Sequence, residues 1–292
     1  MKQAFTAVLL GILPALTGCL THTHSVPLVR RADVVMDASL DHLITQVNDQ
    51  FNAIQTMSAS VEIVASTGGS LKGSVTESPS FSGYLFLRKP ESMRVLLLVP
   101  VLRTRALDMV SDGKDFKLLI PSKNKAMVGL DQVITPSKNG LENLRPFVFF
   151  DSLLVRGIQD DEIVSRTSDV RIIETTGRKK ELIEEPDYDL QILAQPQGHM
   201  QRTLRVIHIS RANLQPYQQD IYDNSGRIVT RAFYSDYQMY GSIPFPTHII
   251  IKRPLDQYSL TLTITKLSFN QPLDSDQFDL KIPDNVTVQT MH

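Results

Sequence analysis

The chain has one cysteine, Cys19, and no tryptophan among its 292 residues. A single cysteine excludes a disulfide within the chain and any metal site built from several thiolates. After the apolar run Ala4–Leu16, the sequence also lacks a stretch of about 20 apolar residues, the length that a membrane-spanning helix needs. The folded state must therefore be stabilised by the packing of side chains.

The chain also lacks a strong charge of either sign. It has 30 lysines and arginines against 31 aspartates and glutamates, which gives a formal net charge of −1. Nucleic-acid-binding proteins usually carry a basic patch or stripe. The near equality of basic and acidic residues predicts that nucleic acid is not a partner.

The first nineteen residues predict export and lipidation. A short basic start, Met1-Lys2-Gln3, precedes the apolar run Ala4–Leu16, as in an export signal. Leu16-Thr17-Gly18-Cys19 matches the bacterial lipobox, in which the cysteine receives a diacylglycerol thioether and an N-acyl chain after cleavage. We therefore expect a signal peptide at 1–18, lipidation at Cys19 and a lipidated tether at 19–36. Leu20, rather than aspartate, follows the cysteine, which favours the outer membrane with the protein facing the periplasm.

Motifs typical of enzymes are missing. The sequence has no Gly-x-Ser-x-Gly, His-Glu-x-x-His, P-loop or Gly-x-Gly-x-x-Gly pattern. His22 and His24 have no third ligand nearby in the sequence, and three later histidines stand apart from one another: His199, His208 and His248. We expect no catalytic residue, no metal and no cofactor other than the lipid on Cys19, and hence a protein that is not an enzyme.

The remaining residues, 37–292, predict one domain built mostly from strands. Asp37–Ile54 is expected to be a helix, because its apolar residues recur at helical spacing. Most later segments are short apolar or alternating runs separated by tight turns, such as Asp112-Gly113 and the turn at 223–226, which predicts an antiparallel meander. Phe278–Ile282 is expected to be the last strand.

The segment Leu141–Val155 has a different pattern. A short helix from about Arg145 to Leu154 is expected, since Pro146 suits a first helical turn. Phe147, Phe149 and Phe150 make this helix apolar nearly all round. It must be buried, either permanently in a core or beneath a sheet that can open.

Three short motifs give the chain a resemblance to a known family. Gly83–Pro90, then Met93-Arg94 and Val110–Lys114, resemble periplasmic lipoprotein carriers and receptors of the LolA/LolB type, with the sigma-regulator RseB as a more distant relative. The resemblance implies an α+β fold: a strongly curved antiparallel β-sheet, an unclosed half-barrel, with helices plugging its concave side. Two departures are Lys89, where such carriers have a lid-holding arginine, and the missing tryptophan, for which Tyr84 and Phe86 stand in.

The resemblance and the anchor together predict an outer-membrane lipoprotein that binds acyl chains or another apolar ligand, in lipoprotein or lipid trafficking. The ligand would be an acyl chain or a lipoprotein, and an envelope protein is a possible partner. The alternative is an envelope sensor or assembly scaffold that acts through protein contacts, with the hollow as packed core. The expected ligand-binding residues are Tyr84, Phe86, Arg88, Lys89, Phe147, Phe149 and Phe150.

Overall fold

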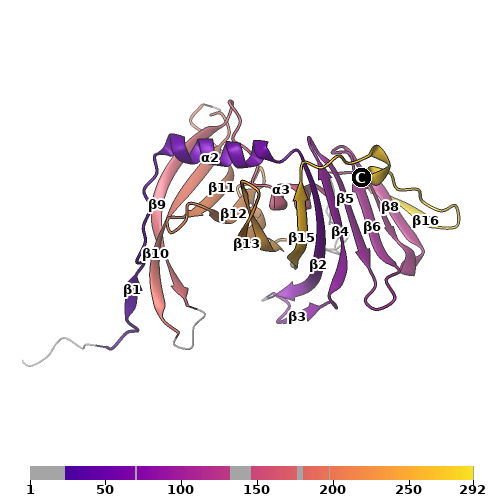
Figure 1. The fold of residues 1–292 in the computed structure, drawn as a ribbon, viewed down its shortest axis with the longest axis horizontal. Coiled ribbons are helices and arrows are strands. Elements are labelled where there is room, and N and C mark those ends of the chain that lie inside the picture. The colour runs from indigo at the N-terminus through magenta and orange to yellow at the C-terminus, as the bar shows by residue number, and fades with distance from the viewer. Residues whose placement is uncertain (1–23, 70, 132–145, 176–179, 197, 292) are drawn as a thin grey trace, which may run out of the picture.

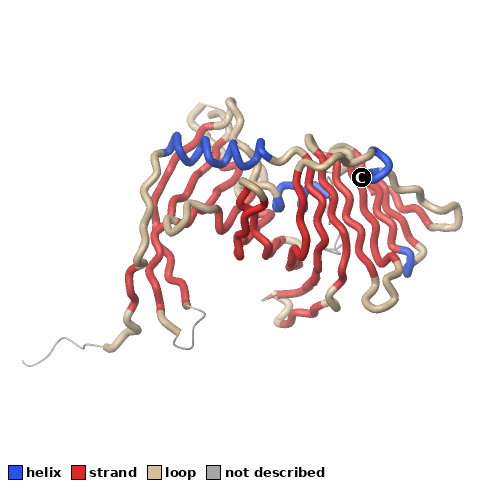
Figure 2. Tube along the Cα trace, viewed as in Figure 1, coloured by secondary structure: helices blue, strands red, loops and turns tan. Residues whose placement is uncertain are grey.

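The structure is a computed structural model that describes residues 24–69, 71–131, 146–175, 180–196 and 198–291. Strands dominate it, and helices are few (Figure 2). The helices are α2 (Leu40–Ala53) and α3 (Pro146–Leu153), with short 3-10 turns η2 (Pro121–Lys123) and η4 (Ser275–Phe278). The strands are β1 (Val29–Arg31), β2 (Thr56–Gly69), β3 (Ser74–Glu77), β4 (Phe81–Arg88), β5 (Ser92–Leu98), β6 (Arg105–Ser111), β7 (Asp115–Ile120), β8 (Lys125–Leu130), β9 (Ile163–Glu174), β10 (Leu182–Leu193), β11 (Thr203–Ser210), β12 (Pro216–Tyr222), β13 (Ile228–Tyr240), β14 (Ile243–Arg253), β15 (Tyr258–Phe269) and β16 (Thr287–Met291).

The described strands form one unclosed, curved sheet of 16 strands, in the order β1-β10-β11-β12-β13-β14-β15-β2-β4-β5-β6-β7-β8-β16, with β3 on β2 and β9 on β10 (Figure 1). The predicted α+β curved sheet is confirmed, but the sheet is mixed rather than purely antiparallel. β1 pairs with β10 and β16 pairs with β8 in parallel. These two strands reach the sheet through long connections. Tight turns join most of the other neighbours as antiparallel pairs, whereas β15 and β2 pair antiparallel although they are far apart in the sequence.

The predicted hairpin turns occur where aspartates can hold the turn. The Asp112 carboxylate accepts the backbone N–H groups of Lys114 and Asp115, at 3.0 and 2.9 Å. Gly113 has a φ of 93°, a conformation that glycine adopts without steric cost. Asp223 likewise accepts the N–H groups of Ser225 and Arg227, at 2.8 and 2.9 Å. Both turns therefore fix the register of the strands that they join.

Helix α2 confirms the predicted N-terminal helix and covers one end of the concave face (Figure 1). Ser39 caps its start by accepting the His42 N–H at 3.2 Å. Leu43 and Val47 are buried against apolar residues of β10 and β11. Further along, Phe51 and Ile54 pack on the larger core beneath β2 and β4. The helix thereby joins the two halves of the sheet.

Two segments near the ends of the chain differ from the sequence pattern. Val29–Arg31 lies inside the predicted tether and forms β1, which pairs with three residues of β10. Phe278–Ile282 is not a strand: Phe278 ends η4, and the residues after it cross the outer face of the sheet, where Leu280 is buried among Val110, Leu119 and Ala126. The alternation of Phe278, Leu280 and Ile282 reflects packing on that face rather than strand pairing.

The segment at 270–286, called the C-terminal strap, is held by cations of the outer face. Arg94 donates to the Gln277 carbonyl oxygen at 3.0 Å and makes two hydrogen bonds with the buried Asp108 carboxylate, at 2.9 and 2.8 Å. Arg88 donates to the Leu273 carbonyl oxygen at 3.2 Å. The strap therefore covers side chains that would otherwise lie on an open sheet surface.

Candidate ligand-binding site

Helix α3 lies inside the curve of the sheet, as expected for an apolar helix. It packs against β13 on one side and β5 and β6 on the other (Figure 1). Val148, Phe149, Phe150 and Leu153 are each at most 5 % exposed. The prediction of a short buried helix here is confirmed over the described residues, and α3 plugs the concave side.

The side chains around α3 fill much of the hollow. Phe149 and Leu153 belong to one continuous core with Leu85, Leu87 and Val95 of the sheet. A cavity of about 40 Å³ lies beside this core, near Phe51 and Leu154. This space holds at most a few water molecules. The interior is therefore packed where α3 touches it.

Two larger cavities flank α3. The first, of about 520 Å³, is bounded by Met93, Phe147, Phe150, Ile221 and Val229, together with polar residues that include Glu91, Asp151 and Arg156. The second, of about 510 Å³, is bounded on its other side by Phe51, Lys89 and Pro90. Phe150, Glu91 and Arg156 line both cavities. Each volume lies in the range of small-molecule sites, roughly 300–1,000 Å³.

Ion pairs and hydrogen bonds hold the C-terminal end of α3 between the cavities. Arg156 lies 3.2 Å from the Asp151 carboxylate of α3 and 3.7 Å from the Glu91 carboxylate of the β4–β5 turn. Burial raises the pKa of the Asp151 carboxyl, against the attraction of Arg156 and Arg205. Arg205 donates to the Gly157 carbonyl oxygen at 3.1 Å and to Glu162 at 2.9 Å. The helix is thus tied to the sheet by few ionic contacts at its C-terminal end.

Lys89 holds α2 rather than α3. Its ammonium donates to the Phe51 carbonyl oxygen near the C-terminus of the helix and lies 3.4 Å from the Phe51 ring centroid. Cations are favourable near a helix C-terminus. Burial lowers the pKa of Lys89 to about 8. A single ammonium suffices for this contact, so the planar fork of an arginine is not needed.

Three of the expected ligand-binding residues do not face the hollow. Along β4, Leu85 and Leu87 are fully buried on the concave side, so Tyr84, Phe86 and Arg88 point to the outer face. Tyr84 is 41 % exposed, and its ring stacks on Phe86 with centroids 6.4 Å apart. Arg88 lies 4.6 Å from the ring centroid of Phe278 in the strap. Their expected place in the hollow is corrected: Leu85 and Leu87 occupy it.

The other expected residues lie at or near the cavities. Phe147 lines the first cavity, Phe150 lines both and Lys89 lines the second, whereas Phe149 is core. Cys19 lies outside the described residues. A role for any of these residues in binding a ligand stays a prediction.

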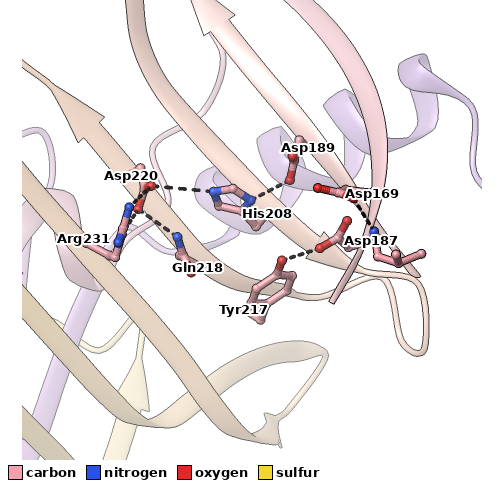
Figure 3. A network of polar contacts seen from close by, with 9 residues as sticks. Asp169, Asp187, Asp189, His208, Tyr217, Gln218, Asp220 and Arg231 are labelled. Carbon is pink, nitrogen blue, oxygen red and sulfur yellow. Dashed lines mark hydrogen bonds and ion pairs between the residues drawn. The ribbon is translucent and has the colours of Figure 1, made fainter. Parts of the chain in front are cut away.

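Sequence reasoning missed a polar network on the outer face of β10–β13 (Figure 3). The His208 ring contacts the Asp189 carboxylate at 2.5 Å and the Asp220 carboxylate at 3.9 Å. Burial works to lower the pKa of His208, but the two carboxylates outweigh it and raise the pKa to about 9. Arg231 makes two hydrogen bonds of 2.8 Å with Asp220. His208 is therefore a charged structural residue at neutral pH.

Residues 24–69, 71–131, 146–175, 180–196 and 198–291 contain no group of three or more histidines, cysteines or carboxylates placed to hold a metal ion. Within the same ranges, neither helix has the length and apolar content to cross a membrane.

A protein-family model described as "-like: Uncharacterized protein" matches residues 161–282. No curated protein sequence matches the chain.

Several solved structures are similar to this chain. A LolA superfamily protein from Nitrosomonas europaea is 15 % identical, with a TM-score of 0.49, over 81 % of this chain and 97 % of that one. A DUF1329 family protein from Desulfovibrio piger is 16 % identical, with a TM-score of 0.48, over 81 % and 94 %. A domain from Vibrio parahaemolyticus named for outer membrane lipoprotein sorting is 12 % identical, with a TM-score of 0.47, over 81 % and 94 %. A LolA superfamily protein is thus among the solved structures to which this chain is similar, in line with the resemblance that the sequence indicates.

Proposed function

We propose that this protein is a lipid-anchored outer-membrane protein, facing the periplasm, that binds an acyl chain or a similar apolar ligand beside α3. The observation that carries the proposal is the position of α3, an apolar helix between two cavities that share Phe150 as a wall. Burial of hydrocarbon contributes roughly 25 cal/mol per Å². Partial displacement of α3 would join the cavities and lengthen the site. No covalent chemistry is needed, so the role is binding and transfer rather than catalysis.

A second candidate function follows from the packed core around Phe149 and Leu153. If α3 never moves, the hollow is structural and the protein acts as an envelope sensor or scaffold through protein contacts. Lipid binding separates the two functions, because only the first requires that hydrocarbon enter.

The test is a titration of the lipid-free protein with a fluorescent fatty acid. We expect saturable binding that unlabelled fatty acid competes away. Phe147→Arg places a charge in the first cavity and should weaken binding at least tenfold. Phe86→Arg is the matched control, because Phe86 is a half-buried aromatic residue of the outer face, and it should leave affinity unchanged. A wild type that binds no fatty acid at any concentration tested would leave the scaffold function.

The anchor is tested separately. Cys19→Ala removes the only thiol of the chain and is expected to leave the protein folded but unanchored, since several acyl chains are what make such attachment stable. Cell fractionation with a high-salt wash measures this, with the unaltered chain as control, and a density gradient shows which membrane holds it. A Cys19→Ala protein that still pellets with membranes contradicts the anchor, and an unaltered chain found only in the inner membrane contradicts the outer-membrane location.

A further inference from the structure

The strand β9 is a long edge strand of the sheet. It pairs with β10 over all twelve residues, while β1 and β11 occupy the other side of β10. In the part of the chain that the structure describes, no strand pairs with the second side of β9. Part of the β9–β10 hairpin extends away from the body of the molecule (Figures 1 and 2). An unpaired margin of this kind is a template for pairing with another chain.

The pairing with β10 shows which backbone groups face outward. Val170 lies opposite Pro186, which has no N–H and whose carbonyl oxygen accepts from Arg211 on the β11 side, at 3.1 Å. Ile172 lies opposite Glu184, whose carbonyl oxygen accepts the Ala32 N–H following β1 at 3.1 Å. In an antiparallel ladder, when the backbone groups of one residue point away from the neighbouring strand, those of the residue directly opposite also point away from it. The N–H and C=O groups of Val170 and Ile172 therefore face the open side.

The open side is not buried by side chains of this chain. Val170 is 52 % exposed and Ile172 is 61 % exposed. The Val170 N–H is bonded to the carboxylate of its own neighbour Asp169, at 2.8 Å. A local side-chain bond of this kind substitutes for a missing partner strand and is readily exchanged for one.

The order of charges along β9 suits a second copy of the same strand. If two β9 strands pair antiparallel with Val170 opposite Val170, then Asp169 lies opposite Arg171, and Arg166 lies opposite Glu174. Opposite charges at facing positions stabilise a sheet, and like charges destabilise it. If the two-fold axis passes through the residue before or after Val170 instead, Asp169 lies opposite Asp169, or Arg171 lies opposite Arg171. The centred register is the one that matches charges on both sides.

We propose that β9 is a homodimerisation edge, which pairs with β9 of a second copy about a two-fold axis at Val170 and joins the two sheets into one. The pairing is isologous, so each charge match occurs twice. This edge lies away from the cavities beside α3, and the proposal does not depend on ligand binding.

The test uses the full chain with Cys19→Ala, so that an introduced cysteine is the only thiol. Val170→Cys should form a disulfide-linked dimer under mild oxidation, because facing residues of a hydrogen-bonded pair have Cα atoms about 5.5 Å apart, within disulfide range. Ser168→Cys is the matched control on the same strand and face. Its two copies would be four residues out of register, about 13 Å apart, and should cross-link at least tenfold less. Absence of cross-linking at Val170, or equal cross-linking at both positions, overturns the proposal.

Sedimentation equilibrium of the cysteine-free chain tests the charge matches without a cross-link. Arg166→Glu should weaken dimerisation about tenfold, and Arg166→Glu combined with Glu174→Arg should restore it. Thermal melts confirm that each variant is folded, since Arg166 also donates to the Ala38 carbonyl oxygen. A monomeric wild type, or a dimer that Arg166→Glu leaves intact, overturns the proposal.

Discussion

Phe149→Ala is expected to lower the free energy of unfolding by about 3–5 kcal/mol, the usual cost of emptying a fully buried phenylalanine site. Phe149 is 2 % exposed and packs in the core that α3 shares with the sheet. The surrounding side chains are expected to relax only in part into the space. Urea denaturation followed by circular dichroism measures the loss. Affinity for a fluorescent fatty acid should hold or rise, because the variant leaves more room in the hollow.

Phe147→Ala is the matched control on the same helix. Phe147 is only partly buried and lines the first cavity, so its removal should cost clearly less stability than removal of Phe149. Equal losses would show that the two side chains are equally packed, which contradicts the placement of α3 described above. Loss of stability in Phe149→Ala with loss of all lipid binding would contradict displacement of α3 by ligand.

Arg94→Leu is expected to lower the free energy of unfolding by about 3 kcal/mol or more. It removes the guanidinium that makes a bidentate pair with the fully buried Asp108 carboxylate. Arg105 remains 3.2 Å from Asp108 but is 43 % exposed, so it compensates only in part. The variant also loses the bond to the Gln277 carbonyl oxygen. Chemical denaturation measures the loss, and limited proteolysis should cut the released C-terminal strap sooner.

Two controls isolate the buried pair. Arg94→Leu combined with Asp108→Leu removes both charges and should recover much of the stability, since an apolar replacement of a buried pair is often neutral. Arg30→Leu breaks an ion pair with Glu181 whose side chains are 60 % and 43 % exposed, and it should cost at most about 1 kcal/mol. A cost for Arg94→Leu no larger than that of Arg30→Leu would contradict the role given to Asp108.

The sequence predicts α2 and α3 well because each carries an unambiguous pattern. The inward face of β4 could not be predicted, since Tyr84, Leu85, Phe86 and Leu87 are apolar on both faces of the strand. At the end of the strand, Arg88 lies 4.6 Å from the ring centroid of Phe278 in the C-terminal strap. No local pattern marks this contact, because the two residues are far apart in the sequence.

The polar contacts of the candidate site were beyond prediction for a related reason. Glu91 and Arg156 are 65 residues apart in the sequence, and His208 meets Asp189 and Asp220 only when β10, β11 and β12 lie side by side. No local pattern marks these residues as partners. By contrast, Phe147 and Phe150 could be assigned to the hollow because an apolar helix must be buried somewhere.

The parallel pairing of β1 and β16 constrains the order of folding. β1 cannot pair until β10 has been made and placed, about 150 residues later, and β16 must return to β8 from more than 150 residues away. Hairpins between neighbouring strands close short loops and form quickly, whereas contacts so distant in sequence form slowly. The hairpins should form first, and the distant pairings of β2 with β15, β1 with β10 and β16 with β8 should form last. Until then the edges of β10 and β8 that later pair with β1 and β16 have unpaired backbone groups. Aggregation is therefore most favoured at this stage of folding.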